Sequence, residues 1–530
     1  MMKRSISLAA VLLAVFACGE KSGPVDPTPK PTAPTSITLS QTAFSVAQAG
    51  ETLSLDISAP VRPKVEGMPS WIAYKDGTFK DYKMTVNLVV SANDTYESRT
   101  AELTVSASGV TSQKVTVSQA GKEEEPTPPG PSPKDNDAWA MAAKLGLGWN
   151  MGNQFDGYFN GSWAGEKEGY PDEGVWQPDG AKAATQATFD GVKQAGFTSV
   201  RIPVSWLKMI GPAPEYKIDE TWLNRVYEVV GFAHNAGLNV IVNTHHDENH
   251  GVNNDYQWLD IKNAANNAAL NAQIKEKIHA VWTQIATKFK DCGDWLILES
   301  FNELNDGEWG WSEAFRNNPT KQCNILNEWN QVFVDAVRAT GGENATRWLG
   351  VPTYAANPEY EKYFTMPSDP AGRMMLAVHY YDPSDYTILE AQYSDWGHTG
   401  AADKKASYGD EDHVRAVFGN LCTKYVDKNV PVYLGEFGCS MRAKSDTRAW
   451  RFYLYYMEYV VKAAKTYGLP CYLWDNGAMG SGQEQHGYIN HGNGAYIGNS
   501  KEVIDLMVKA WFTEAAGYTL DTVYQSAPIF

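Results

Sequence analysis

The sequence predicts an α/β fold, in which a (β/α)8 TIM barrel follows a small all-β, immunoglobulin-like sandwich. Three observations support this prediction. Short strand patterns with period-two alternation fill residues 36–120. Eight short apolar runs alternate with helical patterns across residues 137–517, as expected for a closed parallel barrel. Proline-rich stretches separate the regions, and residues 518–530 are expected to form a C-terminal tail.

Residues 1–17 indicate an export signal peptide, with Lys3 and Arg4 ahead of an apolar run too short to span a bilayer. The sequence Val15-Phe16-Ala17-Cys18 resembles a lipobox, which predicts that Cys18 is lipidated. An ordinary secretory signal with a chance cysteine is the alternative. We therefore expect an exported lipoprotein of a Gram-negative bacterium, at the outer membrane or cell surface or in the periplasm, that contacts the membrane only through its N-terminal lipid.

Two linkers flank the all-β domain. Residues 18–35 are rich in Pro and Thr and residues 121–136 in Pro and Glu, so both are expected to be extended. Within residues 36–120, five runs alternate apolar and polar residues, which predicts a β-sandwich. These runs are Ile37–Ser40, Thr52–Ile57, Met84–Val90, Ala101–Val105 and Lys114–Ser118.

The eight apolar runs of the second domain are expected to be parallel strands buried on both faces. They are Leu145–Trp149, Ser199–Pro203, Val240–Asn243, Trp295–Glu299, Trp348–Pro352, Met374–Val378, Pro431–Leu434 and Pro470–Leu473. The helical patterns are Asp190–Ala195, Trp222–Asn235, Ala272–Lys290, Asn327–Thr340, Glu411–Lys428, Trp450–Lys465 and Lys501–Trp511. An open doubly wound sheet is the alternative, although no glycine-rich dinucleotide loop follows the first run.

Charge and cysteine content exclude several classes of function. The chain has 62 Asp and Glu against 45 Lys and Arg, a net charge of −17, which argues against a protein that binds a nucleic-acid backbone. The six cysteines form no Cys-x-x-Cys pair, which excludes a zinc knuckle, and no disulfide framework is predicted. Aromatic residues reach 12%, and rings with a polar edge suit sugar faces as well as cores.

Polar side chains follow most of the apolar runs, and the strand ends of a closed barrel meet at its C-terminal mouth. Glu303 and Glu436 follow the fourth and seventh runs, which we expect to face each other across the mouth. Two carboxylates that flank a pocket are what glycosidic cleavage requires. We expect ionised Glu436 to raise the pKa of Glu303, which then keeps the proton of an acid catalyst. The alternative is a salt bridge at the mouth, which we prefer for Glu299.

The motifs at these strand ends resemble glycoside hydrolase family 5 across residues 137–517. They are Arg201-Ile-Pro-Val-Ser-Trp206, His245-His246, Phe301-Asn302-Glu303-Leu304, His379-Tyr-Tyr381, Gly435-Glu436-Phe437-Gly438 and Trp474. The segment Gly148-Trp149-Asn150-Met151-Gly152-Asn153 resembles the opening of subfamily 4, the endo-acting β-glucanases and xyloglucanases. Met151 and Gln154 depart from the usual form of that motif.

The all-β domain resembles the BACON domain in its Trp71-Ile72 pair, its Arg99–Val105 strand and its closing residues 115–121. The name of that family implies carbohydrate binding. A spacer role is the alternative that we prefer, with Trp71 in the core. The candidates for a face that stacks on sugars are Trp71, Tyr74, Phe79, Tyr82 and Tyr96.

The resemblance to family 5 implies a retaining endo-β-1,4-glucanase that acts on cellulose-type chains, mixed-linkage glucan or xyloglucan. Glu436 would be the nucleophile and Glu303 the general acid and later the base, with carboxyl groups about 5–5.5 Å apart. Asn302 would bind the sugar 2-hydroxyl. Arg201 and Tyr381 would hold Glu436 ionised, because a cation and a phenol donor both favour the carboxylate.

The remaining candidates line the sugar-binding cleft. The resemblance implies that His379 lies beside the acid, that His245 and His246 line the glycone side, and that Trp474 forms the floor under the sugar. We expect further substrate contacts from loop residues. Because Trp is often buried, about half of the Trp side chains among them are expected to pack in the protein instead. These residues are Asn153, Trp176, Trp258, Trp309, Trp311 and Trp396.

Three alternatives remain. A β-mannanase or xylanase is the nearest other activity, and a non-catalytic surface glycan-binding lipoprotein belongs to another class; a binder would have lost Glu303 or Glu436. The third alternative is a zinc hydrolase. His246 and His250 have the spacing of zinc ligands, but they follow a strand rather than lie on a helix. We expect no metal, no cofactor and no nucleic acid, and a monomer whose partner is a β-glucan polysaccharide.

Overall fold

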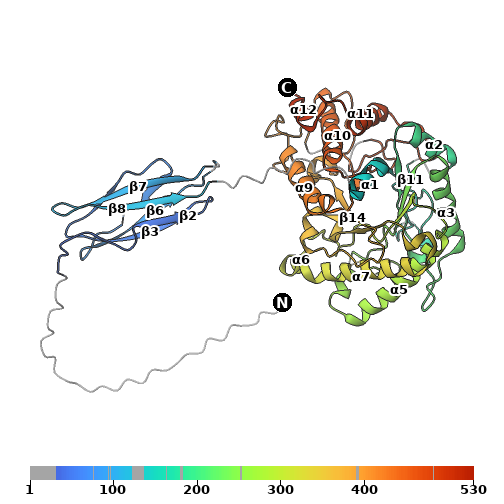
Figure 1. Cartoon of the computed structure of the whole chain (residues 1–530), viewed down its shortest axis with the longest axis horizontal. Coiled ribbons are helices and arrows are strands. Elements are labelled where there is room, and N and C mark those ends of the chain that lie inside the picture. The colour runs from blue at the N-terminus through green and yellow to red at the C-terminus, as the bar shows by residue number, and fades with distance from the viewer. Residues whose placement is uncertain are drawn as a thin grey trace, which may run out of the picture. The chain divides into compact units, whose positions relative to one another are not determined.

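The chain divides into two compact units, Met1–Thr127 and Pro128–Phe530, which are described separately (Figure 1). The predicted signal peptide, Cys18, Tyr96 and most of both predicted linkers lie outside the described residues. None of the described helices is both long and apolar enough to cross a membrane. The computed structural model describes residues 32–75, 77–93, 95, 97–121, 136–162, 164–178, 183–250, 254–389, 393–480 and 483–530.

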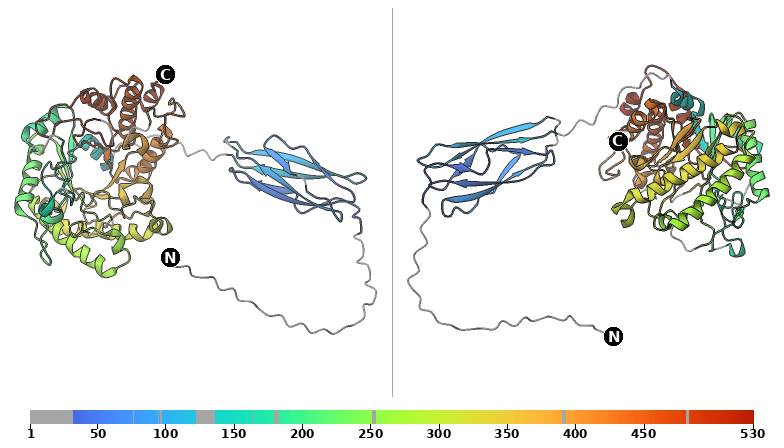
Figure 2. Two further views of the ribbon diagram at one scale, coloured as in Figure 1. Left: turned by 180° about the vertical axis from the view of Figure 1, so that it is seen from behind. Right: turned by 60° about the horizontal axis from the view of Figure 1, so that its bottom comes forward.

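The N-terminal unit is a sandwich of two four-stranded sheets (Figure 2). One sheet has the order β1 (Thr38–Leu39), β3 (Glu51–Ser58), β6 (Lys83–Val90) and β5 (Ile72–Lys75). The other has the order β2 (Ala43–Val46), β8 (Gln113–Gln119), β7 (Arg99–Ser106) and β4 (Lys64–Glu66). Buried and exposed residues alternate along β3 and β6, so that one face of each sheet packs in the core. The predicted all-β domain is thus confirmed.

The sequence analysis missed three strands of the sandwich, β2, β4 and β5, each of three or four residues. Trp71 lies beside β5, partly buried against the core. The guanidinium of Arg99 covers one face of its ring, with Cζ 4.5 Å from the ring centroid. That face of Trp71 is therefore closed to a sugar.

Eight parallel strands close the barrel in the order β10-β11-β12-β13-β14-β15-β16-β9, which confirms the predicted fold. Every residue of these strands except Asn239 is buried, as expected for a barrel wrapped by helices. The strands are β9 (Leu147–Asn150), β10 (Ser199–Ile202), β11 (Asn239–Asn243), β12 (Leu296–Glu299), β13 (Leu349–Pro352), β14 (Met374–Tyr380), β15 (Val432–Phe437) and β16 (Cys471–Leu473).

Helices surround the strands (Figure 1). Asp or Asn side chains cap the first turns of α1, α3, α4, α5, α9 and α10 by accepting backbone N–H bonds. The α-helices are α1 (Asp137–Leu145), α2 (Gln186–Gln194), α3 (Glu220–Asn235), α4 (Ile261–Ala264), α5 (Ala268–Lys288), α6 (Glu313–Asn317), α7 (Pro319–Ala339), α8 (Ser384–Thr387), α9 (Glu411–Lys424), α10 (Thr447–Tyr467), α11 (Ser500–Phe512) and α12 (Leu520–Gln525).

Short 3-10 helices complete the chain. Two of them, η4 and η5, lie in the connection between β13 and β14. The segment predicted as a C-terminal tail contains α12, whose Leu520 and Val523 are buried. The 3-10 helices are η1 (Gly165–Lys167), η2 (Leu207–Met209), η3 (Gly342–Ala345), η4 (Tyr354–Ala356), η5 (Pro358–Tyr363) and η6 (Val426–Lys428).

The inside of the barrel is filled by a small apolar cluster of its own. It consists of Ile241, Ile297, Met375, Ala377, Tyr433 and Tyr472 from the strands, together with Met141 and Leu145 of α1, which closes the floor. Two glycines make room for the tyrosine rings. A Cβ on Gly148 would lie 2.2 Å from the Tyr472 ring, and one on Gly350 would lie 2.2 Å from Tyr433 Oη.

The five cysteines among the described residues are buried free thiols, in agreement with the absence of a predicted disulfide framework. Burial raises the pKa of Cys439 to about 11, which keeps it protonated near neutral pH. Cys439 follows the Glu436 motif but is therefore a packing residue.

Gly350→Ala is expected to destabilise the barrel by about 1–3 kcal/mol, because the new methyl group overpacks the interior against Tyr433. Gly231→Ala in α3 is the matched control, since a Cβ there meets no described atom within 4 Å and removes a helix-interior glycine. Urea denaturation followed by tryptophan fluorescence compares the two variants. Equal stabilities would contradict the tight packing of Tyr433 against β13.

Candidate active site

A polar layer lies directly above the apolar interior, at the carboxyl ends of the strands. Its centre is Arg201 on β10, whose side chain is fully buried. The guanidinium donates hydrogen bonds to Glu299 Oε1 and Glu436 Oε1, each at 2.7 Å. It also donates to Asn302 Oδ1 at 2.8 Å and to Asn150 Oδ1 at 3.1 Å. One buried cation therefore orients two carboxylates and two amides.

Glu299 on β12 is an ion-pair partner, as the sequence predicted. Besides Arg201, Asn243 Nδ2 donates to its Oε1 at 2.9 Å, and the Tyr433 hydroxyl donates to its Oε2 at 2.6 Å. Burial raises the pKa of Glu299, but the charge and hydrogen bonds of Arg201 outweigh burial and leave that pKa below its usual value. Both carboxylate oxygens are occupied, which leaves this group no part in proton transfer.

Glu436 on β15 is held from both sides. Arg201 binds its Oε1, and the Tyr381 hydroxyl donates to its Oε2 at 3.0 Å. Burial raises the pKa of Glu436 above its usual value, although the charge of Arg201 acts to lower it. The side chain is 7% exposed, so a carboxylate with fixed direction reaches the mouth of the barrel.

Glu303 lies in the loop after β12, close to Glu436. One carboxylate oxygen of Glu303 and one of Glu436 lie within 4.8 Å of each other, and His379 Nδ1 lies within the same limit of both. His379 on β14 contacts Glu303 Oε1 at 2.6 Å and lies 3.7 Å from Glu436 Oε2. The two predicted catalytic carboxylates thus meet at the mouth, with His379 between them.

The two carboxyl groups have different electrostatic surroundings. Burial raises the pKa of Glu303 to about 8, with further contributions from the charges of Glu248 and Glu484. The sequence analysis attributed this raised pKa to ionised Glu436; burial is instead the largest cause, followed by the charge of Glu248. Burial also lowers the pKa of His379 to about 4, so its imidazole is neutral near pH 7. Glu303 is thus suited to keep its proton near neutral pH, whereas the guanidinium of Arg201 favours the ionised form of Glu436.

Asn302 follows β12 and precedes Glu303. Because Arg201 occupies its Oδ1, the amide orientation is fixed with Nδ2 as the free donor, which has no hydrogen-bond partner among the described residues. This donor suits a substrate hydroxyl.

His245 and His246 follow β11 side by side, with ring centroids 4.4 Å apart. Asn243 Nδ2 points at His245 Nδ1 at 3.2 Å, and the His245 Nε2 lies 3.9 Å from Glu436 Oε1. The His245 ring lies parallel to that of Trp474, with centroids 5.8 Å apart. These contacts place His245 beside Glu436, with Trp474 parallel to its ring.

Three predicted aromatic contacts lie on loops around the mouth. Trp176 packs 5.5 Å from His246 and donates its indole N–H to the Tyr158 carbonyl. Trp309 is 47% exposed and lies 6.1 Å from the ring of His250. Trp258 is half-buried, and the ammonium of Lys277 covers one of its faces at 4.6 Å.

The prediction that Trp396 binds substrate is wrong. Its side chain is 2% exposed, and its indole N–H donates to the Gly409 carbonyl at 2.7 Å. The ring packs on Tyr455, Tyr456 and Tyr459 of α10. No face of this indole is open to a sugar.

Asn153 and Asp156 occupy the loop after β9. Asn153 adopts a left-handed backbone with φ 58°, and its N–H donates to Asp156 Oδ2 at 3.0 Å. Asp156 is fully buried, and its Oδ2 lies 3.8 Å from His246 Nε2. The turn thus places Asp156 under the predicted glycone side.

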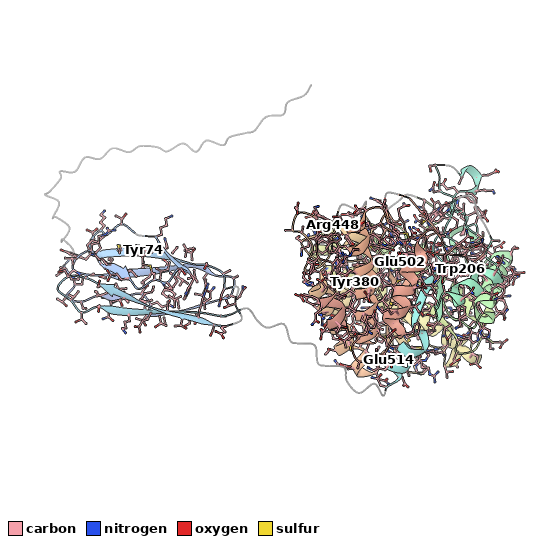
Figure 3. The ribbon with its side chains drawn as sticks, turned by 90° about the horizontal axis from the view of Figure 1, so that it is seen from above. Tyr74, Trp206, Tyr380, Arg448, Glu502 and Glu514 are labelled. Atoms are coloured by element: carbon pink, nitrogen blue, oxygen red, sulfur yellow. The ribbon has the colours of Figure 1, made fainter. Side chains whose placement is uncertain are left out.

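Tyr380 and Trp206, labelled in Figure 3, belong to the sequence motifs of the site but are buried in the core. Along β14 the side chains alternate, so His379 faces the mouth while Tyr380 packs on Phe418 of α9 at 4.9 Å. Trp206 donates its backbone N–H to Asp247 Oδ2 at 2.9 Å. These residues support the site without entering it.

Sequence reasoning missed three acidic residues near the site, Asp156, Glu248 and Glu484. Glu248 lies in the His-His-Asp-Glu run, whose acidic residues were a readable signal. Glu484 lies in the loop after β16 and had no motif to mark it.

Among the described residues, two groups of three His, Asp or Glu side chains each bring one possible ligand atom from every member within 4.8 Å of the others. They are Glu303 with His379 and Glu436, and Asp156 with His245 and His246. His246 and His250, which have the spacing of zinc ligands, are not together in either group; Glu248 Oε1 lies near both rings, 3.3 Å from His246 Nδ1 and 3.7 Å from His250 Nε2. The first cluster is the carboxylate pair itself.

Comparison with known proteins agrees with this geometry. Residues 159–480 match the family model for cellulase, glycosyl hydrolase family 5, and residues 64–120 match BACON, a putative N-terminal binding domain. Endoglucanase A of Paenibacillus barcinonensis is 37% identical over 66% of this chain and 84% of its own length. A xyloglucan-specific endo-beta-1,4-glucanase of Bacteroides ovatus is 34% identical over 81% of this chain and 83% of its own.

Among solved structures, a GH5-4 broad-specificity endoglucanase from Bacteroides salanitronis is 49% identical, with a TM-score of 0.65. The match covers 71% of this chain and 95% of that one. The closed barrel, the facing carboxylates and these matches agree, and the chain belongs to glycosyl hydrolase family 5, subfamily 4, with a BACON domain at its N-terminal side.

Proposed function

We propose that this protein is a retaining endo-β-1,4-glucanase, with Glu436 as nucleophile and Glu303 as acid and base. The observation that supports this most is the short separation of the two carboxylates, with oxygens within 4.8 Å. Retaining enzymes hold these groups about 5–5.5 Å apart, whereas inverting enzymes leave room for a water molecule at about 6.5–9.5 Å.

The reaction proceeds in two displacements. In the first, Glu436 Oε attacks the anomeric carbon, the glycosidic C–O bond breaks, and Glu303 gives its proton to the departing oxygen. In the second, Glu303 takes a proton from water, whose oxygen attacks the same carbon and releases Glu436. Arg201 and Tyr381 aim Glu436, while the Asn302 amide donates to the 2-hydroxyl as charge develops.

The substrate we propose is a β-1,4-linked glucan such as a cellulose-type chain, mixed-linkage glucan or xyloglucan. The names of the curated relatives support this class. Trp474 and Trp176 offer indole faces near Glu436 and His246 for pyranose rings. A mannanase, a xylanase or a non-catalytic binding protein finds no support in these relatives, and both carboxylates are in place.

We also propose that the protein is an exported lipoprotein of a Gram-negative bacterium, anchored through Cys18 and acting as a monomer. The support for export and for the anchor is the sequence of residues 1–18 alone. The catalytic domain then extends over residues 137–517, with the BACON domain and linkers as a tether.

Glu303→Gln and Glu436→Gln are each expected to lower the rate of hydrolysis of soluble β-glucan by at least about a thousandfold. The first removes the general acid and base, and the second removes the nucleophile. With 2,4-dinitrophenyl β-cellobioside, whose leaving group needs no proton, Glu303→Gln keeps a burst of dinitrophenol while Glu436→Gln does not. Glu361→Gln is the control, since that buried glutamate pairs with Lys424 of α9. Unchanged turnover in either catalytic variant would refute the assignment.

The rate is expected to fall on both sides of neutral pH. Since the pKa of Glu303 is raised to about 8, kcat/KM on a glucan is expected to decline above that pH as the acid loses its proton. The decline at low pH follows protonation of Glu436, whose pKa lies above the usual value. A pH profile measured on soluble glucan tests this; a basic limb with a midpoint near pH 5 would contradict the role of Glu303.

Removal of residues 1–135 is expected to leave turnover on soluble glucans intact, because every residue placed at the mouth lies in the second unit. The truncation should keep Asn136, which caps α1. Initial rates of the truncated and full-length proteins on the same glucan provide the comparison. A large loss of rate would show that the first unit takes part in the site.

A further inference from the structure

Glu248 lies between two histidines in the loop after β11. Its side chain is 3% exposed, and its Oε1 lies 3.3 Å from His246 Nδ1 and 3.7 Å from His250 Nε2. Its Oε2 is buried with no hydrogen-bond partner among the described residues. Burial of a carboxylate without a cation beside it is strongly unfavourable, so the charge of Glu248 calls for a proton on a neighbouring imidazole.

The two nitrogens of His246 both face carboxylate oxygens. Nδ1 faces Glu248 Oε1 at 3.3 Å, and Nε2 faces Asp156 Oδ2 at 3.8 Å. A neutral imidazole has one donor and one acceptor, and its acceptor nitrogen would face an oxygen lone pair. An imidazolium, with two donors, is compatible with both neighbours: Nδ1 donates to Glu248, while the Nε2 N–H, 3.8 Å from Asp156, is too far to be committed to that carboxyl group and can donate to another acceptor.

His245, one residue earlier, is held in the neutral form instead. Its Nδ1 faces the amide donor of Asn243 and must accept, which leaves a single N–H on Nε2. Burial lowers the pKa of His245 well below its usual value. The two neighbouring histidines therefore differ in charge because their partners differ.

We propose that Glu248 is a positioning residue that keeps His246 as an imidazolium beside the catalytic carboxylates, so that His246 meets the glycone only as a hydrogen-bond donor. The role toward the glycone rests on the proposed function. The protonation of His246 does not.

The surrounding charges support this state. Burial lowers the pKa of His246, but the hydrogen bond and charge of Glu248 outweigh burial and raise that pKa to about 9. His245, the adjacent titratable ring, stays neutral. The other ionisable groups that interact with His246 are the carboxyl groups of Asp156, Glu303, Glu436 and Glu484, which come from four further segments.

Glu248 also reaches the loop that carries the acid. His250 Nε2 lies 3.5 Å from Asn305 Nδ2, which itself donates to the Glu303 carbonyl at 2.8 Å. Asn305 Oδ1 accepts from the N–H of Gly307 at 2.7 Å, ahead of Trp309. Glu248 thus links the glycone side of the cleft to the loop of Glu303.

Histidine NMR on the full-length protein tests the protonation directly. We expect the Cε1 and Hε1 signals of His246, assigned with His246→Asn, to remain those of an imidazolium to above pH 8. In Glu248→Gln, where burial dominates, the midpoint is expected at or below about 6.5. A midpoint at or below that value in the unaltered protein, or equal midpoints in both, overturns the proposal.

Kinetics on a soluble glucan test the consequence. In Glu248→Gln, KM is expected to rise about five- to twentyfold between pH 6 and pH 8, as His246 loses its proton, while kcat follows the unaltered profile. Glu248→Asp, which keeps the charge, restores a flat KM. A KM that rises equally at every pH indicates a merely structural role and overturns the proposal.

Glu411→Gln is the matched control. Glu411 is also buried and lies 2.9 Å from a histidine, His398, but on α9. We expect no change in the pH dependence of KM in this variant. Should the protein fail to hydrolyse glucans, the NMR midpoints still decide the state of His246; should Glu248→Gln fail to fold, the midpoint of the unaltered protein decides it.

Discussion

The interaction on which the mouth of the barrel depends is the set of hydrogen bonds made by the buried guanidinium of Arg201. A fully buried cation is stable only where carboxylates balance it, and here Glu299 and Glu436 do so. Glu299 also accepts hydrogen bonds from Asn243 and Tyr433, which occupy both of its oxygens and give it a structural role. Glu436 keeps one side toward the mouth, and the same cation that stabilises the fold thereby directs the nucleophile.

Identical residue types acquire different chemistry at this site through their partners. Glu436 lies against a guanidinium and a phenol, whereas Glu303 lies against a neutral imidazole with further carboxylates nearby. Burial acts on both, but only Glu436 has a cation in contact. The division of labour between proton donor and nucleophile follows from these contacts rather than from the side chains themselves.

The barrel and its carboxylate pair were predictable because the signals are local. Eight apolar runs mark the strands, and the polar residues that follow them converge once the sheet closes. Burial by distant segments leaves no such signal. Trp396 and Trp309 look alike in loop sequence, yet α10 covers one and leaves the other exposed. Glu484, which raises the pKa of Glu303, comes from a loop with no motif.

The floor of the barrel has a consequence for access. Asn136 caps α1 and donates to the Val426 carbonyl, at the end of the barrel opposite the carboxylates. The polypeptide that precedes Asn136 therefore joins the barrel at its closed end. The opposite end, where Glu303 and Glu436 lie, is formed by the ends of the strands and the loops that follow them.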